Sequence, residues 1–121
     1  MRAVFIKGGS QYDATRLFID EMAEAFRRRG YVTTVIDGLM AEDLCQTFSA
    51  AAAHGQTDLV YTINVLGDFR DRRGRSVGQI FNAPHVVQFV DSPLTHLDWL
   101  QGAAPESAIM TVDPTHVDAV R

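Results

Sequence analysis

Five short apolar segments alternate with longer segments of mixed polarity along this chain of 121 residues, and no other feature limits the fold as strongly. The first of them, Ala3–Ile6, is continuously apolar, as in a strand that is covered on both faces of a sheet. The five strands are expected at residues 3–6, 31–36, 58–64, 85–90 and 108–112. With helices between them, right-handed crossovers fold such a chain into a three-layer, doubly wound α/β domain of the Rossmann-like class, with a five-stranded parallel sheet.

Helix signals occupy the segments between the predicted strands. Ser10 followed by Asp13 forms a variant capping box, with Asp in place of the usual Glu, and Gly30 ends the helix that follows. The expected apolar face of this helix carries Phe18, Met22, Ala25 and Phe26. The other helices are expected at residues 41–53, 76–81 and 96–100 and after Pro114.

The composition bounds the class of protein. With 46% hydrophobic and 21% charged residues, the chain has ordinary globular composition and is long enough to bury a core without disulfides. A net charge of −4 gives no electrostatic reason to bind nucleic acid or an anionic membrane. Cys45 is the single cysteine, and no apolar run approaches the length of a membrane span. We therefore expect one domain over residues 1–121, located in the cytoplasm.

Two loops that follow predicted strands are the first candidates for a ligand site. Open α/β sheets bind ligands beyond the carboxyl ends of their strands, at the point where the strand order reverses. We expect the strand order 3-2-1-4-5, which places Gly8, Gly9 and Ser10 opposite residues 91–96 in one crevice. Glycines let a ligand approach the backbone, and the free N–H groups at the start of a helix can hold an anion. The alternative interpretation is a tight turn from strand to helix without a ligand.

His96 and Asp91 are the candidate catalytic residues. His96 lies just beyond a strand end with Asp91 five residues earlier, and a histidine oriented by a carboxylate can act as a general base. The alternative is a histidine that bonds only to the local backbone at a helix start. Asp113 and His116 repeat the arrangement after the fifth strand. The candidate substrate-binding residues are Gly8, Gly9, Ser10, Asp13, Asn64, Pro93, Asp113 and His116.

Metal and nucleotide motifs fit the sequence poorly. The four histidines are scattered, with no helical i,i+4 pair and no second cysteine, so we predict neither a metal site nor a cofactor. His54 is expected to end a helix and His85 to begin a strand. Residues 8–13 match neither the G-x-G-x-x-G dinucleotide fingerprint nor the Walker pattern, and the first strand lacks the paired acidic residues of a receiver domain.

An arginine-rich segment interrupts the strand and helix rhythm after the third strand. Its arginines are Arg70, Arg72, Arg73 and Arg75. They could clamp phosphate or carboxylate groups. We favour the alternative, a solvated loop, because Asp68 and Asp71 offset much of the charge.

Three segments of the chain resemble bacterial glycosyltransferases related to the CgeB-like spore-maturation group. The run Gly8-Gly9-Ser10-Gln11-Tyr12, with Arg16, Phe18, Glu21 and Gly30 after it, is similar to the start of these enzymes. The run Val90-Asp91-Ser92-Pro93-Leu94-Thr95-His96 resembles their D-H-P-x-x-H stretch, with Ser92 where that stretch has a histidine. The segment from Thr111 to Val117 looks like their next strand-to-helix junction.

The resemblance implies a GT-B architecture, in which two Rossmann-like domains enclose the active site. In such enzymes the N-terminal domain receives the acceptor and the C-terminal domain holds the nucleotide-sugar. This chain then corresponds to the acceptor-side half of a longer protein, and we expect no transferase activity from these 121 residues alone. The implied partners are a nucleotide-sugar donor, held by a further C-terminal domain, and a sugar, lipid or protein acceptor. The alternative is a standalone α/β module that binds or senses a small ligand without catalysis.

Overall fold

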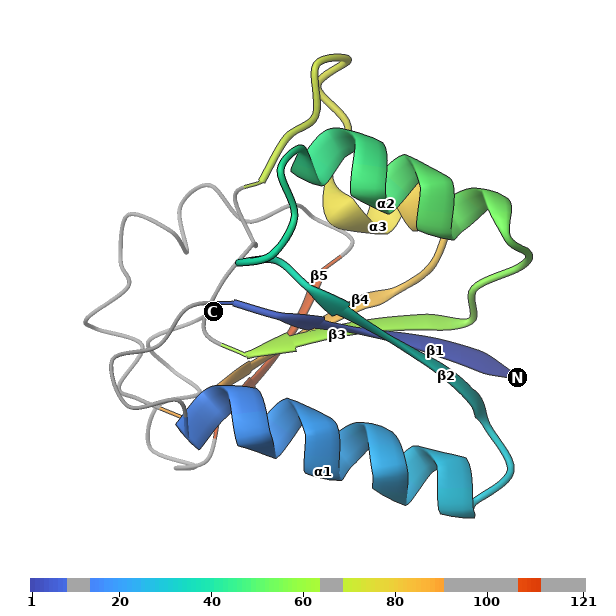
Figure 1. Ribbon diagram of the computed structural model, residues 1–121, viewed down its shortest axis with the longest axis vertical. Helices are drawn as coiled ribbons and strands as arrows, with labels where there is room; N and C mark the ends of the chain where they lie inside the picture. The colour runs from blue at the N-terminus through green and yellow to red at the C-terminus, as the bar shows by residue number, and fades with distance from the viewer. Residues whose placement is uncertain (9–13, 64–68, 91–106, 112–121) are drawn as a thin grey trace.

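A parallel five-stranded sheet with helices on both faces forms the fold (Figure 1). The structure is a computed structural model that describes residues 1–8, 14–63, 69–90 and 107–111. The elements are β1 (Arg2–Lys7), α1 (Ala14–Arg28), β2 (Val32–Asp37), α2 (Leu44–Ala53), β3 (Leu59–Ile63), α3 (Val77–Phe81), β4 (His85–Phe89) and β5 (Ser107–Thr111). The predicted α/β class and all five parallel strands are confirmed. The helices predicted at 96–100 and after Pro114 lie outside the described residues.

The strand order corrects the prediction. The sheet runs β2-β1-β3-β4-β5, so the expected order 3-2-1-4-5 is wrong and β3 lies between β1 and β4. Burial gives the physical reason, because a central strand must be apolar on both faces. Residues Val60–Ile63 of β3 are all buried, whereas β2 leaves Val32 and Val35 exposed, as an edge strand does. The reversal point of this order lies between β1 and β3.

The two faces of the sheet carry separate apolar clusters. Successive residues of a strand point to opposite faces, so Val4 of β1 packs with Phe48 of α2 and Phe81 of α3, whereas Phe5 packs with Ile19 of α1. In Figure 1, α2 and α3 cover one face and α1 covers the other. This arrangement confirms the predicted three layers.

The buried face of α1 is rotated from the predicted one. Met22 and Phe26 pack against the core, but Phe18 is 39% exposed and Ala25 is also exposed. The fully buried positions are Ile19 and Ala23. Together with Met22 and Phe26, these two residues have the i, i+3, i+4, i+7 spacing of one helix face. The large apolar side chain of Phe18 led the sequence prediction to a neighbouring face of the helix.

Caps fix where α2 and α3 begin. Asp43 caps α2, and its carboxylate accepts a hydrogen bond from the Gln46 backbone N–H at 3.2 Å. Ser76 and Gln79 form a reciprocal capping box at the start of α3. Both helices therefore start at defined positions. In the sequence, α2 precedes the segment that contains the arginines and α3 follows it.

Candidate functional site

The carboxyl ends of the strands form the edge at which the sequence predicts a ligand site. Gly8, directly after β1, is the predicted site residue that the structure describes, and it is partly buried. The remaining candidates lie outside the described residues: Gly9, Ser10, Asp13, Asn64, Asp91, Pro93, His96, Asp113 and His116.

The observed strand order changes the predicted crevice. β1 and β4 are not neighbours, because β3 separates them, so the two strands lie about 10 Å apart, which is two strand spacings. The expectation that these two strands are neighbours is therefore wrong. On the side of β1 opposite β2, the neighbouring strand is β3, and Asn64 follows β3 in the sequence. In the sequence, Asn64 thus follows the strand at the reversal point, and Asp91 comes after the strand next to it, β4.

A tightly bonded group, which we call the β1–β2 corner, consists of Lys7, Gly8, Arg16, Asp37 and Gly38. The guanidinium of Arg16 donates from Nη1 to the Gly8 carbonyl at 3.2 Å and to Asp37 Oδ1 at 3.0 Å. Its Nη2 donates to Asp37 Oδ2, which completes a bidentate pair. Gly38 N–H donates to the Lys7 carbonyl at 2.9 Å, and a Cβ at Gly38 would lie 2.8 Å from that oxygen.

Each charged side chain of the β1–β2 corner has an ion-pair partner, Arg16 with Asp37 inside the corner and Lys7 with Asp20 of α1. The hydrogen bond from Arg16 holds the pKa of Asp37 below its usual value, with help from the Leu39 backbone N–H and against the effect of desolvation. Lys7 Nζ lies 2.7 Å from the Asp20 carboxylate. Because both oxygens of Asp37 are occupied by Arg16, this carboxylate cannot serve as the ribose ligand of a dinucleotide site without losing that pair. The corner is thus a structural junction between β1, β2 and α1.

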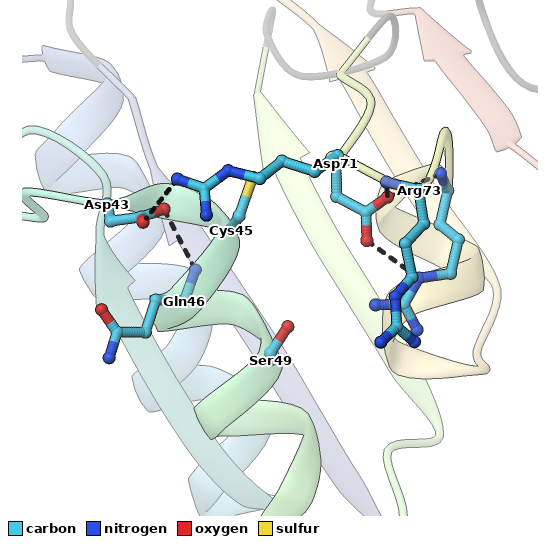
Figure 2. Close-up of a pocket in the computed structure, with 8 residues that line it drawn as sticks. Asp43, Cys45, Gln46, Ser49, Asp71 and Arg73 are labelled. Atoms are coloured by element: carbon cyan, nitrogen blue, oxygen red, sulfur yellow. Dashed lines mark hydrogen bonds and ion pairs between the residues drawn. The ribbon is translucent and has the colours of Figure 1, made fainter.

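A second polar region, the arginine pocket, lies between α2 and the loop before α3 (Figure 2). Its volume is about 500 Å³. The lining residues are Asp43, Cys45, Gln46, Ser49, Asp71, Arg72, Arg73 and Arg75. The pocket includes Asp43 and Cys45 from the start of α2. This helix follows the carboxyl end of β2 and covers the same face of the sheet as α3 (Figure 1). The pocket therefore lies on the side of the sheet where open α/β folds bind ligands.

Asp71 organises the loop that carries the arginines. Its carboxylate accepts hydrogen bonds from the backbone N–H of Arg73 at 2.9 Å and of Arg75 at 2.8 Å, and from Arg75 Nε at 2.8 Å. Desolvation raises the pKa of Asp71, but these hydrogen bonds outweigh it and the pKa falls below its usual value. Gly74, at φ 77°, closes the turn by donating to the Asp71 carbonyl. The loop is thus built around one carboxylate that is 5% exposed.

Sequence reasoning recognised the arginines but missed the pocket. The favoured solvated loop agrees with the exposed side chains of Arg70, Arg72 and Arg73, but the contact of Arg72 with Asp43, with Nη2 3.2 Å from Oδ2, was not foreseen. Gln46 and Ser49 carried no sequence signal, because only the tertiary packing brings them opposite the loop. The available sequence signal was the spacing of Asp71 and Arg75, which are four residues apart and form an ion pair within the turn.

Two of the four histidines lie where the sequence placed them. His54 ends α2 and His85 begins β4, with His85 Nε2 2.9 Å from Thr62 Oγ1 inside the sheet. Within residues 1–8, 14–63, 69–90 and 107–111, no group of three or more His, Cys, Asp or Glu side chains could hold a metal ion. None of the helices in the described part of the chain is long and apolar enough to cross a membrane.

Comparison with known proteins provides no relative from which a residue role could be transferred. No protein-family model, curated protein or solved structure matches the chain. The sheet and its helices define an α/β, Rossmann-like arrangement, and any functional assignment rests on the residues themselves.

Proposed function

We propose that this chain is the acceptor-side domain of a glycosyltransferase, which moves a sugar from a nucleotide-sugar donor to an acceptor hydroxyl in the cytoplasm. The observation that carries the proposal is the common edge of the parallel sheet. The three segments that resemble CgeB-like glycosyltransferases follow Lys7, Phe89 and Thr111, the last residues of β1, β4 and β5. The strands before these segments therefore end at one edge of the sheet, where α/β folds bind ligands, although Lys7 is far from Phe89 and Thr111 in the sequence.

The corrected strand order supports the same proposal. The strands β1, β3, β4 and β5 lie side by side, so the ends of β1 and β5 are separated by three strand spacings, about 15 Å. Each of these strands is followed in the sequence by one of the candidate residues Gly8, Asn64, Asp91 or Asp113. The four strands that precede these residues thus all end at the same edge of the sheet.

The proposed reaction assigns distinct tasks to these loops. Displacement at the anomeric carbon requires a base for the acceptor hydroxyl and positive dipoles for the leaving diphosphate. We assign the base to His96, oriented by Asp91. The start of α1, which Arg16 joins to the Gly8 carbonyl, directs the positive end of a helix dipole toward the carboxyl edge. A further C-terminal domain holds the nucleotide in this proposal.

The test is nucleotide-sugar turnover by the full-length native polypeptide that contains this chain, followed as release of nucleoside diphosphate. His96→Ala should lower turnover by about 100-fold, since a positioned general base contributes at least that much. His54→Ala is the matched control, because His54 is an exposed helix-ending residue with no assigned role. Unchanged turnover in His96→Ala would remove His96 from the mechanism.

A ligand-binding or sensing module without catalysis is the second candidate function. It is favoured by the pairing of the charged groups in the β1–β2 corner, where Lys7, Arg16 and Asp37 each have an ion-pair partner and none is left free for acid–base work. Binding of a nucleotide-sugar or sugar by the full-length polypeptide, with no release of nucleoside diphosphate from any donor tested, would support this candidate against the transferase.

A further inference from the structure

The arginines of the pocket are carried by an ordered backbone. The Asp71 carboxylate binds two backbone N–H groups of the loop, and the Asp71 N–H donates to the Arg75 carbonyl at 3.0 Å. Gly74 closes the same turn. A loop fixed in this way presents its guanidinium groups at defined positions, so a ligand would not have to order the backbone when it binds.

The charges of the pocket leave one cation unmatched. Its carboxylates are Asp43 and Asp71, and its cations are Arg72, Arg73 and Arg75. Asp43 pairs with Arg72, and Asp71 pairs with Arg75. Within the described residues, the guanidinium of Arg73 has no hydrogen-bond or ion-pair partner. The pocket therefore carries an excess positive charge at its loop side.

The opposite wall of the pocket supplies neutral hydrogen-bonding groups. Gln46 and Ser49 of α2 both line the pocket, and the Ser49 hydroxyl points toward the loop, whereas the Gln46 side chain leaves the helix on the other side (Figure 2). The Ser49 hydroxyl can donate a hydrogen bond to an anion.

We propose that the arginine pocket binds a phosphate group carried by a small molecule. The planar guanidinium of Arg73 matches the oxygens of phosphate, and the Ser49 hydroxyl points toward the loop from the opposite wall (Figure 2). Arg72 is 84% exposed and makes a single contact with Asp43, so it can turn from that carboxylate toward a bound dianion. This inference goes beyond the transferase proposal, because a phosphate can bind here whether or not the chain takes part in sugar transfer.

The test is an NMR titration of the full 121-residue chain with inorganic phosphate at low ionic strength. Shift changes are expected at the backbone amides of Gln46, Ser49 and Arg73. Arg73→Gln should weaken phosphate binding about tenfold, since it removes a charge-assisted contact. Arg29→Gln, which removes the same charge from an exposed site beyond α1, should leave the affinity unchanged. Circular dichroism checks that both variants fold.

The outcomes distinguish a specific phosphate site in the pocket from nonspecific electrostatic attraction of phosphate to the chain. Equal weakening by Arg73→Gln and Arg29→Gln would overturn the proposal, as would phosphate-induced shifts at the β1–β2 corner instead of the pocket. Citrate that binds as tightly as phosphate would also overturn it, because the site would then take carboxylates. Phosphate binding at Arg73 without sugar transfer by the full-length polypeptide would keep this inference and remove the transferase proposal, so the two fail separately.

Discussion

The β1–β2 corner and the arginine pocket use the same two residue types in opposite ways. In the corner, Arg16 contacts three acceptor atoms, and the side chains of Arg16 and Asp37 are 19% and 28% exposed. In the pocket, Arg72 contacts Asp43 through one hydrogen bond and is 84% exposed. Burial and the number of acceptors, rather than the pairing of opposite charges, decide which arginine holds the fold together.

The difference follows from the elements that carry the side chains. Arg16 lies in the first turn of a helix and Asp37 at the end of a strand, so both backbones are fixed by regular hydrogen bonding. A hydrogen bond to a charged group in such a setting contributes about 1.5–3 kcal/mol, whereas an exposed pair contributes about 0–1 kcal/mol. The corner should therefore determine stability, and the pocket should leave the guanidinium groups of Arg72 and Arg73 available to a ligand.

The strongest way to test this contrast is to remove Asp37. Asp37→Ala leaves the partly buried Arg16 guanidinium without its carboxylate and should lower the free energy of unfolding by about 2–3 kcal/mol. Asp20→Ala is the matched control, because Asp20 is 48% exposed and should cost less than about 1 kcal/mol. Urea denaturation measures both. If the free energy of unfolding of Asp37→Ala lies within about 0.5 kcal/mol of the wild-type value, the change is no larger than that of an ordinary surface substitution. The corner would then contribute no more to stability than the pocket.

Two glycines provide a second test of the contrast. A Cβ at Gly38 would lie 2.8 Å from the backbone oxygen of Lys7, so Gly38→Ala forces the corner apart and should cost about 2 kcal/mol. Nothing lies within 4 Å of the corresponding position at Gly74 in the pocket loop, where φ is +77°. Gly74→Ala therefore carries only backbone strain, about 1 kcal/mol. A larger loss of unfolding free energy in Gly74→Ala than in Gly38→Ala would reverse the contrast.

The sequence predicted the elements of the fold better than their arrangement. All five strands were located within one or two residues because each has a local apolar pattern. Their order was wrong because it depends on which strand is buried on both faces, a property of the whole sheet. The two threonines of β2, Thr33 and Thr34, were the available hint that this strand lies at an edge rather than beside two neighbours.

The polar regions were harder to predict than the strands. Arg16 and Asp37 are 21 residues apart, and no motif links them, so only the packing of α1 beside β2 reveals their pair. In the pocket the arginines were visible in the sequence, but Gln46 and Ser49 were not distinguishable from other helix residues. Long-range proximity, rather than residue type, was the missing information in both regions.

The pH dependence of stability gives a third and smaller test. Because Arg16 lowers the pKa of Asp37 in the folded chain, the unfolded chain binds a proton at this carboxyl more readily. The stabilisation is therefore complete above the ordinary value of 3.8 and is lost as the pH falls through the lower folded-state pKa. Urea denaturation between pH 2.5 and 6 should show a shallower acid loss in Asp37→Asn than in the wild type. Identical pH profiles would mean that Arg16 does not stabilise the ionised carboxylate.

The smallest expected effect is that of Arg72→Gln. Its exposed guanidinium makes a single contact with Asp43, so the free energy of unfolding should change by less than about 0.5 kcal/mol. Arg16→Gln is the comparison in the corner and should cost about 2 kcal/mol, because it leaves Asp37 partly buried without a cation. Urea denaturation of the two variants side by side measures the difference. Equal losses would make Arg72 a structural residue, and the pocket would then have one guanidinium fewer to offer an anion.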